Sequence, residues 1–266
     1  MPDDTGGTGD ARHRLPVPRL LARRMGRAVS DFRMIHPGDR ILVALSGGKD
    51  SLSMLALLQE LQRHSPVSFS LGVATVDPMS PDYEPSPLRG YVQESGLPYF
   101  LERQDIFGRA RKHMGRPSYC SFCARMRRGV LYHCARREGY NVLALGQHLD
   151  DFAESFLMST FYNGELRTMK AHYRVREGDL RVIRPLVYCR ERQTRAFAEA
   201  EGLPVIPENC PACFRHPTER QRMKELLVAQ EQHDPRLFRH LQGALLPLMA
   251  KGLDDADAAR EEIPHE

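Results

Sequence analysis

The sequence predicts an α/β fold in which a parallel sheet is covered by helices on both faces. Two observations support this expectation: short apolar runs alternate with segments of helical periodicity, and one run breaks into a glycine-containing turn that leads into a helix. Such alternation is typical of parallel sheets whose strands are joined by crossover helices. With 266 residues, 41% of them hydrophobic, the chain can bury the core of one main domain.

The expected elements follow from these runs and periodicities. Strands are expected at Ile41–Leu45, Phe69–Val76, Pro98–Leu101, Val142–Leu145, Val182–Leu186 and Pro204–Ile206. Helices are expected at Pro18–Phe32, Asp50–Gln62, Arg89–Ser95, Ser121–Glu138, Asp151–Tyr162, Glu191–Glu201, Pro217–Gln230 and Pro235–Met249. Residues 163–181 lack periodicity and hold several charges, so we expect a loop or lid there.

Polar segments delimit the domain. Residues 1–15 are expected to be disordered and residues 254–266 to form an acidic tail. Between them we expect the main domain at 16–230 and a C-terminal helix at 231–253. No run approaches the ~18–20 apolar residues of a transmembrane helix, and the start of the chain lacks the pattern of a signal peptide. We therefore expect a cytoplasmic protein without membrane association.

Basic residues are concentrated in one region. The formal net charge is only +4, yet ten Lys and Arg residues lie between Arg103 and Arg137 against the single acid Asp105. Such a local excess of positive charge attracts polyanions. A solvated helix face in an arginine-rich chain is the alternative.

The most specific motif is the run Ile41–Ser51, which reads Ile-Leu-Val-Ala-Leu-Ser-Gly-Gly-Lys-Asp-Ser. A strand that turns into a helix presents free backbone N–H groups and the positive end of the helix dipole, which favour phosphate binding. The spacing is not that of a Walker A loop, and an ordinary turn with a helix cap is the structural alternative. The candidate phosphate-binding residues are Ser46, Gly47, Gly48, Lys49 and Ser51.

Acidic residues follow two other expected strands. Asp77 comes after one, and the segment 146–151, Gly-Gln-His-Leu-Asp-Asp, comes after another. Open α/β sheets bind ligands at these carboxyl ends, and the pair Asp150 and Asp151 would suit Mg²⁺. A turn residue is the alternative for Asp77, and helix capping is the alternative for the pair.

Four of the six cysteines form two Cys-x-x-Cys pairs, Cys120 with Cys123 and Cys210 with Cys213. In a cytosolic chain such pairs favour a metal site over disulfides. The first pair begins a basic helix, where the dipole and nearby arginines stabilise thiolates. Tetrahedral zinc, an iron–sulfur cluster with four protein ligands and a cluster with three ligands all remain open, as do a redox dithiol and simple structural thiols.

Taken in order, these motifs resemble the tRNA 2-thiocytidine synthetase (TtcA) family of PP-loop ATP pyrophosphatases. The resemblance spans roughly Leu20 to Leu227 and rests on the motifs at 46–51, 120–132, 145–151, 183–191 and 205–207, followed by a Cys pair. It implies an adenine-nucleotide alpha-hydrolase-like, Rossmann-like sandwich. It also implies ATP, Mg²⁺, a [4Fe-4S] cluster held by three cysteines, and transfer of sulfur to an anticodon-loop cytidine of tRNA.

Together, the motifs and the resemblance assign the site residues. Nucleotide and Mg²⁺ binding is assigned to Ala44, Ser46, Gly47, Gly48, Lys49, Asp50, Ser51, Asp77, Gly146 and Asp151. Catalytic roles are assigned to Asp50, Asp151 and Cys213, and tRNA binding to Arg125, Arg127 and Arg128.

The third cluster ligand requires a choice between two cysteines. Cys120 and Cys123 match the family's first ligand pair. The chain has Asn-Cys-Pro-Ala-Cys at 209–213 where the family usually has Pro-Cys-x-x-Cys, and this form is more similar to the two-thiouridine enzymes. We therefore favour Cys210 over Cys213 as the third ligand. Gln147 also departs from the family, which commonly has His there, and both departures leave the modified base open.

The expected chemistry is activation of a pyrimidine carbonyl by adenylation, followed by replacement of its oxygen with sulfur. The sulfur donor would be a partner such as a cysteine desulfurase. A homodimer is also compatible with the sequence, although no motif marks one. Another PP-loop adenylating enzyme, of the 2-thiouridine, lysidine or amide-ligase type, is one rival interpretation. A nucleotide-responsive RNA-binding or redox-sensing module without turnover is the other.

Overall fold

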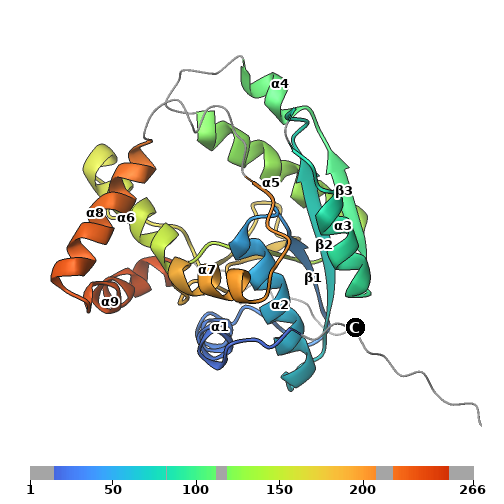
Figure 1. The fold of residues 1–266 in the computed structure, drawn as a ribbon, viewed down its shortest axis with the longest axis horizontal. Coiled ribbons are helices and arrows are strands. Elements are labelled where there is room, and N and C mark those ends of the chain that lie inside the picture. The colour runs from blue at the N-terminus through green and yellow to red at the C-terminus, as the bar shows by residue number, and fades with distance from the viewer. Residues whose placement is uncertain (1–14, 82, 112–118, 208–217, 252–266) are drawn as a thin grey trace, which may run out of the picture.

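A sheet of six strands forms the centre of the molecule in a computed structural model that describes residues 15–81, 83–111, 119–207 and 218–251. The strands lie in the order β3-β2-β1-β4-β6-β5 (Figure 1). Their bounds are β1 Asp39–Ala44, β2 Phe69–Asp77, β3 Tyr99–Arg103, β4 Val142–Ala144, β5 His172–Arg174 and β6 Arg181–Ile183. All pairings are parallel except that of β5 with β6. The strand order reverses between β1 and β4, which is where open sheets bind ligands.

Two expectations about the sheet are wrong. The segment 163–181, expected as a loop or lid, contains β5, and Pro204–Ile206, expected as a strand, forms none. β5 has only three residues, too few for periodicity to reveal. Ile206 donates its backbone N–H to the carbonyl oxygen of Gly47 at 3.0 Å instead of joining the sheet. The chain before the second cysteine pair therefore contacts the predicted phosphate loop.

Helices cover both faces of the sheet, as expected (Figure 1). Their bounds are α1 Arg19–Asp31, α2 Lys49–His64, α3 Ser86–Glu94, α4 Ile106–Arg111, α5 Tyr119–Arg137, α6 Leu149–Asn163, α7 Glu191–Ala200, α8 Glu219–His233 and α9 Leu237–Ala250. The short helix α4 was not expected. α3 begins before the expected Arg89 because Pro87 lies in its first turn, where a missing N–H is tolerated.

The two layers of helices pack on opposite sides of each strand. Ile41 and Val43 belong to the core that β1 shares with α1 and α2, whereas Leu42 packs with Leu131 and Ala135 of α5 on the other face. All five side chains are buried. This arrangement is the period of two expected for a strand covered on both sides.

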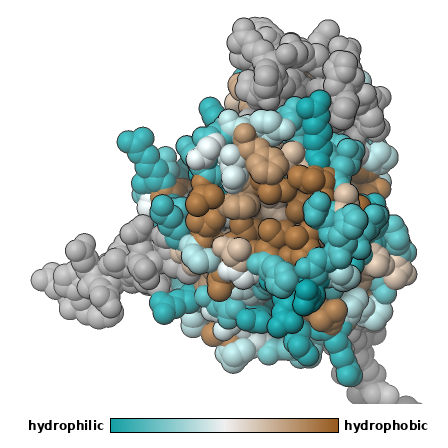
Figure 2. Space-filling model, turned by 90° about the vertical axis from the view of Figure 1, so that its left-hand side faces the viewer, coloured by the Kyte–Doolittle hydropathy of each residue, from teal (hydrophilic) through white to brown (hydrophobic). Residues whose placement is uncertain are grey.

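The side of the molecule formed by α6, α8 and α9 exposes a patch of apolar side chains (Figure 2). Phe161, Leu226 and Leu246 are among the large apolar side chains exposed on these helices. A gathered apolar patch, unlike a single apolar residue, is typical of a surface that contacts another molecule.

Among the helices of the described ranges, none combines the length and hydropathy needed to span a bilayer.

Candidate active site

The predicted phosphate loop connects β1 to α2. Gly48, at φ −75°, is the N-cap of α2 and supplies no side-chain cap, so the first-turn N–H groups remain available for an anion. The Ser51 hydroxyl donates to the Gly48 carbonyl at 2.9 Å and accepts from the Ser46 N–H at 3.2 Å. These hydrogen bonds between Ser46, Gly48 and Ser51 thus stabilise the turn whose backbone N–H groups would contact a phosphate.

Gly47 is the position in this loop that requires glycine. Its φ of +90° is rarely adopted by other residues. A Cβ at Gly47 would clash with the Ile206 side chain and lie 3.3 Å from Leu88 Cδ1. The loop is therefore packed directly beneath the residues that precede the second cysteine pair.

Asp50, in the first turn of α2, is held by three side chains. Lys49 Nζ contacts its carboxylate at 2.9 Å, the Thr194 hydroxyl donates to it at 2.5 Å, and His148 Nε2 lies 3.6 Å away. Burial raises the pKa of Asp50, but His148, Lys49 and Thr194 outweigh that effect and hold the pKa well below its usual value. Asp50 is therefore held as an anion beside the phosphate loop.

Lys49 also contacts Glu191, the first residue of α7, at 3.0 Å. Lys224 and Arg195 contact the same carboxylate at 2.6 and 2.8 Å. Burial raises the pKa of Glu191, yet the two lysines outweigh burial and bring the pKa to about 2. The Lys49 ammonium, predicted to bind phosphate, is thus paired with two carboxylates.

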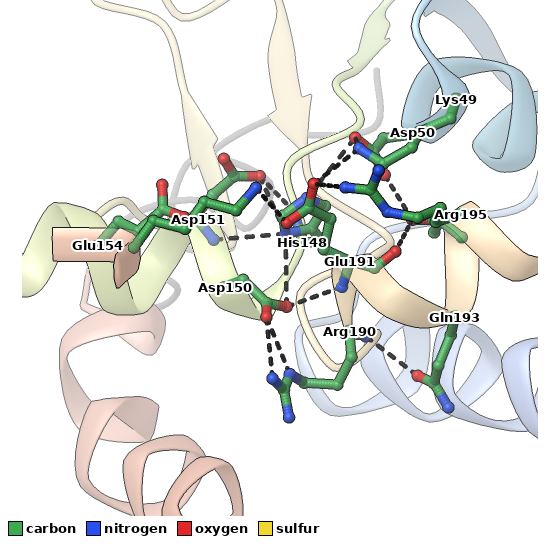
Figure 3. A network of polar contacts seen from close by, with 12 residues as sticks. Lys49, Asp50, His148, Asp150, Asp151, Glu154, Arg190, Glu191, Gln193 and Arg195 are labelled. Carbon is green, nitrogen blue, oxygen red and sulfur yellow. Dashed lines mark hydrogen bonds and ion pairs between the residues drawn. The ribbon is translucent and has the colours of Figure 1, made fainter. Parts of the chain in front are cut away.

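The two carboxylates at the start of α6 differ in their partners (Figure 3). Asp150 accepts from Arg190 Nε at 3.0 Å and from the Glu191 N–H at 2.8 Å. Asp151 forms a capping box with His148, whose backbone N–H donates to its carboxylate at 3.0 Å. Asp150 therefore links α6 to the start of α7 through hydrogen bonds. In the part of the chain that the structure describes, Asp151 has no such contact with α7, so it is the better candidate of the two for binding a metal ion.

The imidazole of His148 links these groups. His148 is buried, with Nδ1 at 3.2 Å from Asp151 and 3.6 Å from Asp150. Burial lowers the pKa of His148, but the surrounding carboxylates, Asp50 included, outweigh burial and raise it. The motif at 146–151 contains this residue, but its role depends on contacts that the local sequence does not reveal.

Glu154 lies one turn further along α6 and contacts Arg220 of α8 at 3.2 Å. Burial raises the pKa of Glu154 to about 7, and Arg220 offsets only part of that effect. Asp151, which Arg220 approaches at 3.8 Å, raises this pKa further. At neutral pH the carboxyl of Glu154 is therefore close to its midpoint of titration.

We expect Glu154→Gln to change how stability depends on pH. The pKa of Glu154 is raised in the fold, so between pH ~4.5 and ~7 the folded state holds the proton that the unfolded state has lost, and stability falls as the pH rises. Gln at this position does not titrate, so the variant does not lose stability in this way. Relative to the wild type, its free energy of unfolding should therefore increase by up to about 3 kcal/mol between pH ~4.5 and ~7. Urea unfolding at several pH values measures the difference. If the difference in unfolding free energy between variant and wild type did not change with pH, the raised pKa of Glu154 would be contradicted. Glu225→Gln, at an exposed site, is the control.

Three other assigned nucleotide-site residues lie at strand ends. Asp77 accepts from Arg103 at 3.0 Å and from the N–H two residues on, which is the behaviour of a turn residue. Gly146 packs against Ser51, whose backbone would lie 3.3 Å from an added Cβ. Ala44 ends β1 and is half-buried. Gly146 and Ala44 thus adjoin the loop, and Asp77 faces the β3 edge.

The described ranges include only part of the cysteine set. Cys120 and Cys123 both lie in the first turns of α5, and Cys123 is half-buried. Residues three apart on a helix share one face, as two ligands of one metal site must. Cys210 and Cys213 lie outside the described residues. Within the described ranges, no group of three or more His, Cys, Asp or Glu side chains is arranged to hold a metal ion.

The single cysteines Cys134 and Cys189 are buried. Burial raises the pKa of each thiol to about 12, with a further increase at Cys134 from Glu102. Thiols of this kind are inert. Their burial supports leaving both outside the predicted metal site.

The arginines assigned to tRNA binding lie on α5. Arg125 and Arg127 are exposed, and Arg128 is half-buried. Gln147, three residues after β4, accepts from Arg184 Nε at 2.9 Å. Although Gln147 replaces the family's usual His, its side-chain oxygen therefore accepts a hydrogen bond from the buried guanidinium of Arg184.

The PP-loop domain family matches residues 20–234 of this chain. The tRNA-cytidine(32) 2-sulfurtransferase of Geobacter sulfurreducens is 42% identical over 243 residues, which cover 91% of this chain and 95% of the relative. The enzyme of the same description from Syntrophotalea carbinolica is 43% identical over 240 residues, covering 90% and 92%. The structure of the U34-tRNA thiolase NcsA from Methanococcus maripaludis with its [4Fe-4S] cluster has a TM-score of 0.67 at 20% identity, covering 93% of this chain and 80% of NcsA. The predicted fold class is therefore confirmed.

Proposed function

Because the chain belongs to the PP-loop domain family, and within it to the family of tRNA-cytidine(32) 2-sulfurtransferases, we propose that it uses ATP to replace the C2 oxygen of an anticodon-loop cytidine in tRNA with sulfur. The observation that carries this proposal is the uncapped helix start at Gly48, with Lys49 and Asp50 beside it, in a chain that spans almost the full length of these relatives. A loop of this form binds phosphate.

The reaction needs two displacements. The C2 oxygen of cytidine attacks the α-phosphorus of ATP, so an O–P bond forms and pyrophosphate leaves. Sulfur at the oxidation level of sulfide then forms a bond to C2, and AMP departs with the original oxygen. A persulfide donor would supply such sulfur only together with a two-electron reductant, such as a dithiol that is oxidised to a disulfide. The loop N–H groups and Lys49 stabilise the charge that develops on pyrophosphate.

We assign a Mg²⁺ ion to Asp50 and Asp151. Both are carboxylates at helix starts beside the loop, and His148 contacts both. Oxygen ligands of this kind suit Mg²⁺ shared with phosphate. Asp150 is not assigned, since its carboxylate links α6 to Arg190 and the Glu191 N–H. Asp50 also accepts hydrogen bonds, but it lies in the first turn after the phosphate loop.

We assign the [4Fe-4S] cluster to Cys120, Cys123 and Cys210, with Cys213 as a thiol that relays sulfur. The donor chemistry fits, because thiolates at the start of a helix that also carries exposed Arg125 and Arg127 are stabilised as anions. A cluster with three protein ligands supplies an iron that can hold exogenous sulfide. The protein's part is to fix the cysteines beside the nucleotide, and Ile206 on the loop supports that placement.

The partners we propose are tRNA, a cysteine desulfurase or similar sulfur donor, and a second copy of the chain. The apolar side chains exposed on α6, α8 and α9 support a contact with another protein. We place the reaction in the cytoplasm, where tRNA is modified.

We expect exposed arginines of α5 to bind tRNA phosphates. Arg125→Gln and Arg127→Gln should each lower the slope of log affinity against log salt by about one, because each phosphate contact releases counterions. Arg128→Gln should have a smaller effect because its side chain is half-buried. Filter binding at several salt concentrations measures the slopes. Arg222→Gln on α8 is the control, and a double variant of Arg125 and Arg127 with the wild-type slope would show that α5 is only a solvated face.

The decisive test of the function combines two measurements. Purified protein should release pyrophosphate from ATP only when tRNA is present, and mass spectrometry of the tRNA nucleosides should then show 2-thiocytidine once a sulfur donor is supplied. A thiolated uridine or a lysidine product would identify a different adenylating enzyme. Nucleotide binding without pyrophosphate release would support a sensor instead.

A further inference from the structure

One face of α8 is turned towards the nucleotide site. The residues of this face recur at helical spacing, and two of them, Met223 and Leu227, are buried. Charged side chains on the same face contact acidic residues of the site: Arg220 contacts Glu154, and Lys224 contacts Glu191. The face of α8 that packs on the site therefore combines buried apolar residues with charged residues that stay partly exposed.

The contact between Lys224 and Glu191 is close to the phosphate loop. Lys224 Nζ lies 2.6 Å from Glu191 Oε2, and Lys49 Nζ lies 3.0 Å from Glu191 Oε1. The Glu191 side chain is only 13% exposed, so these contacts are poorly screened by water. Lys49 and Lys224 thus share one carboxylate.

Nucleotide binding must change this arrangement. Lys49 is held by Asp50 and Glu191, and it has to exchange a carboxylate for phosphate before it can act on ATP. If Lys49 were the principal partner of Glu191, its departure would leave a half-buried carboxylate poorly neutralised, which is costly. Lys224 and Arg195 already contact Glu191, so the carboxylate stays neutralised when Lys49 leaves.

We propose that Lys224 is a positioning residue of the nucleotide site, which neutralises Glu191 and thereby lets Lys49 move to the phosphates of ATP. The inference rests on the proposed function only in requiring that the loop binds ATP. It assigns α8 a part in nucleotide affinity that no motif in the helix indicates.

A thermodynamic cycle tests this role with Mg²⁺ and an ATP analogue whose α–β bridge is methylene, measured by calorimetry without tRNA. Lys224→Gln should weaken binding by about tenfold, and Lys224→Arg should restore it. In a Lys49→Gln background, Lys224→Gln should change affinity by less than about twofold, because the cation that it releases is absent. Adding Glu191→Gln to Lys224→Gln should return the affinity to near that of the wild type.

The control is Arg222→Gln, which removes one charge from an exposed side chain of the same helix. Its affinity and melting temperature should match the wild type, and Lys224→Gln should melt within a few degrees of it. An equal loss from Lys224→Gln with and without Lys49 would make Lys224 a direct phosphate ligand and overturn the proposal. If Lys49→Gln lowers affinity below detection, failure of Glu191→Gln to rescue Lys224→Gln has the same consequence. Failure of the wild type to bind the analogue would overturn the nucleotide site as well, whereas normal binding without tRNA thiolation would count against the proposed reaction alone.

Discussion

Gly47→Val is expected to abolish ATP binding, with a loss of affinity of at least about 100-fold. The backbone at this position has φ +90°, and a side chain there would clash with Ile206. A left-handed conformation costs a β-branched residue ~1–2 kcal/mol, and overpacking adds ~1–3 kcal/mol. The loop can relieve both only by moving, which removes its N–H groups from the phosphate position. Gly48, at φ −75°, adopts a backbone open to other residues, so we expect a smaller effect there.

Calorimetry with ATP and Mg²⁺ measures this effect, and the melting temperature reports whether the variant folds. Gly178→Val is the matched control, because Gly178 has φ +81° with open space around it and lies on the turn before β6. It should lose some stability but keep its ATP affinity. Wild-type affinity in a folded Gly47→Val protein would refute the loop assignment. Partial recovery of Gly47→Ala by Ile206→Ala would separate the clash from the backbone strain.

Loss of any one cluster ligand is expected to remove the iron–sulfur cluster and tRNA thiolation together. We predict this outcome for Cys120→Ala, Cys123→Ala and Cys210→Ala, since two remaining thiolates are too few to anchor the cluster. Cys213→Ala should keep the cluster and lose activity only as far as its thiol relays sulfur. Four protein ligands would close the site to exogenous sulfide, as in a structural metal site.

Anaerobic reconstitution of the variants, with absorbance and iron content as readouts, decides between the ligands. Cys134→Ala is the control, because Cys134 is buried in the hydrophobic core and is not assigned to the cluster. Cluster loss in Cys213→Ala but not in Cys210→Ala would reverse the assignment of the third ligand. Zinc instead of iron in every sample would overturn the mechanism.

Local sequence signals were sufficient for the parts of the site that are local in the chain. The strand, the glycine turn and the start of α2 are contiguous, so hydrophobicity and turn chemistry place them correctly. The distinction between Asp150 and Asp151 could not be made in this way, because both are good first-turn residues. It depends on Arg190, which is 40 residues away in the sequence.

The residues that the sequence did not reveal are those whose roles depend on tertiary contacts. Thr194 reaches Asp50 from α7, and no local pattern marks it. Lys224 lies partly exposed on the face of α8 that packs on the site, whereas binary patterning assigns charged residues to the solvent face. β5 and Pro204–Ile206 were assigned wrongly, since three-residue edge strands and extended segments that bind a loop have the same local composition.

The contacts that fix the phosphate loop also determine when it can form during synthesis. Asp50 depends on Thr194, 144 residues later in the chain, and Gly47 is covered by Ile206. The ribosome synthesises a chain from its N-terminus, so N-terminal segments can fold first. A nascent chain can therefore form the pairing of β1 with β2 long before it has a complete nucleotide site. We therefore expect the complete loop to form only after the segment from Thr194 to Ile206 has been synthesised.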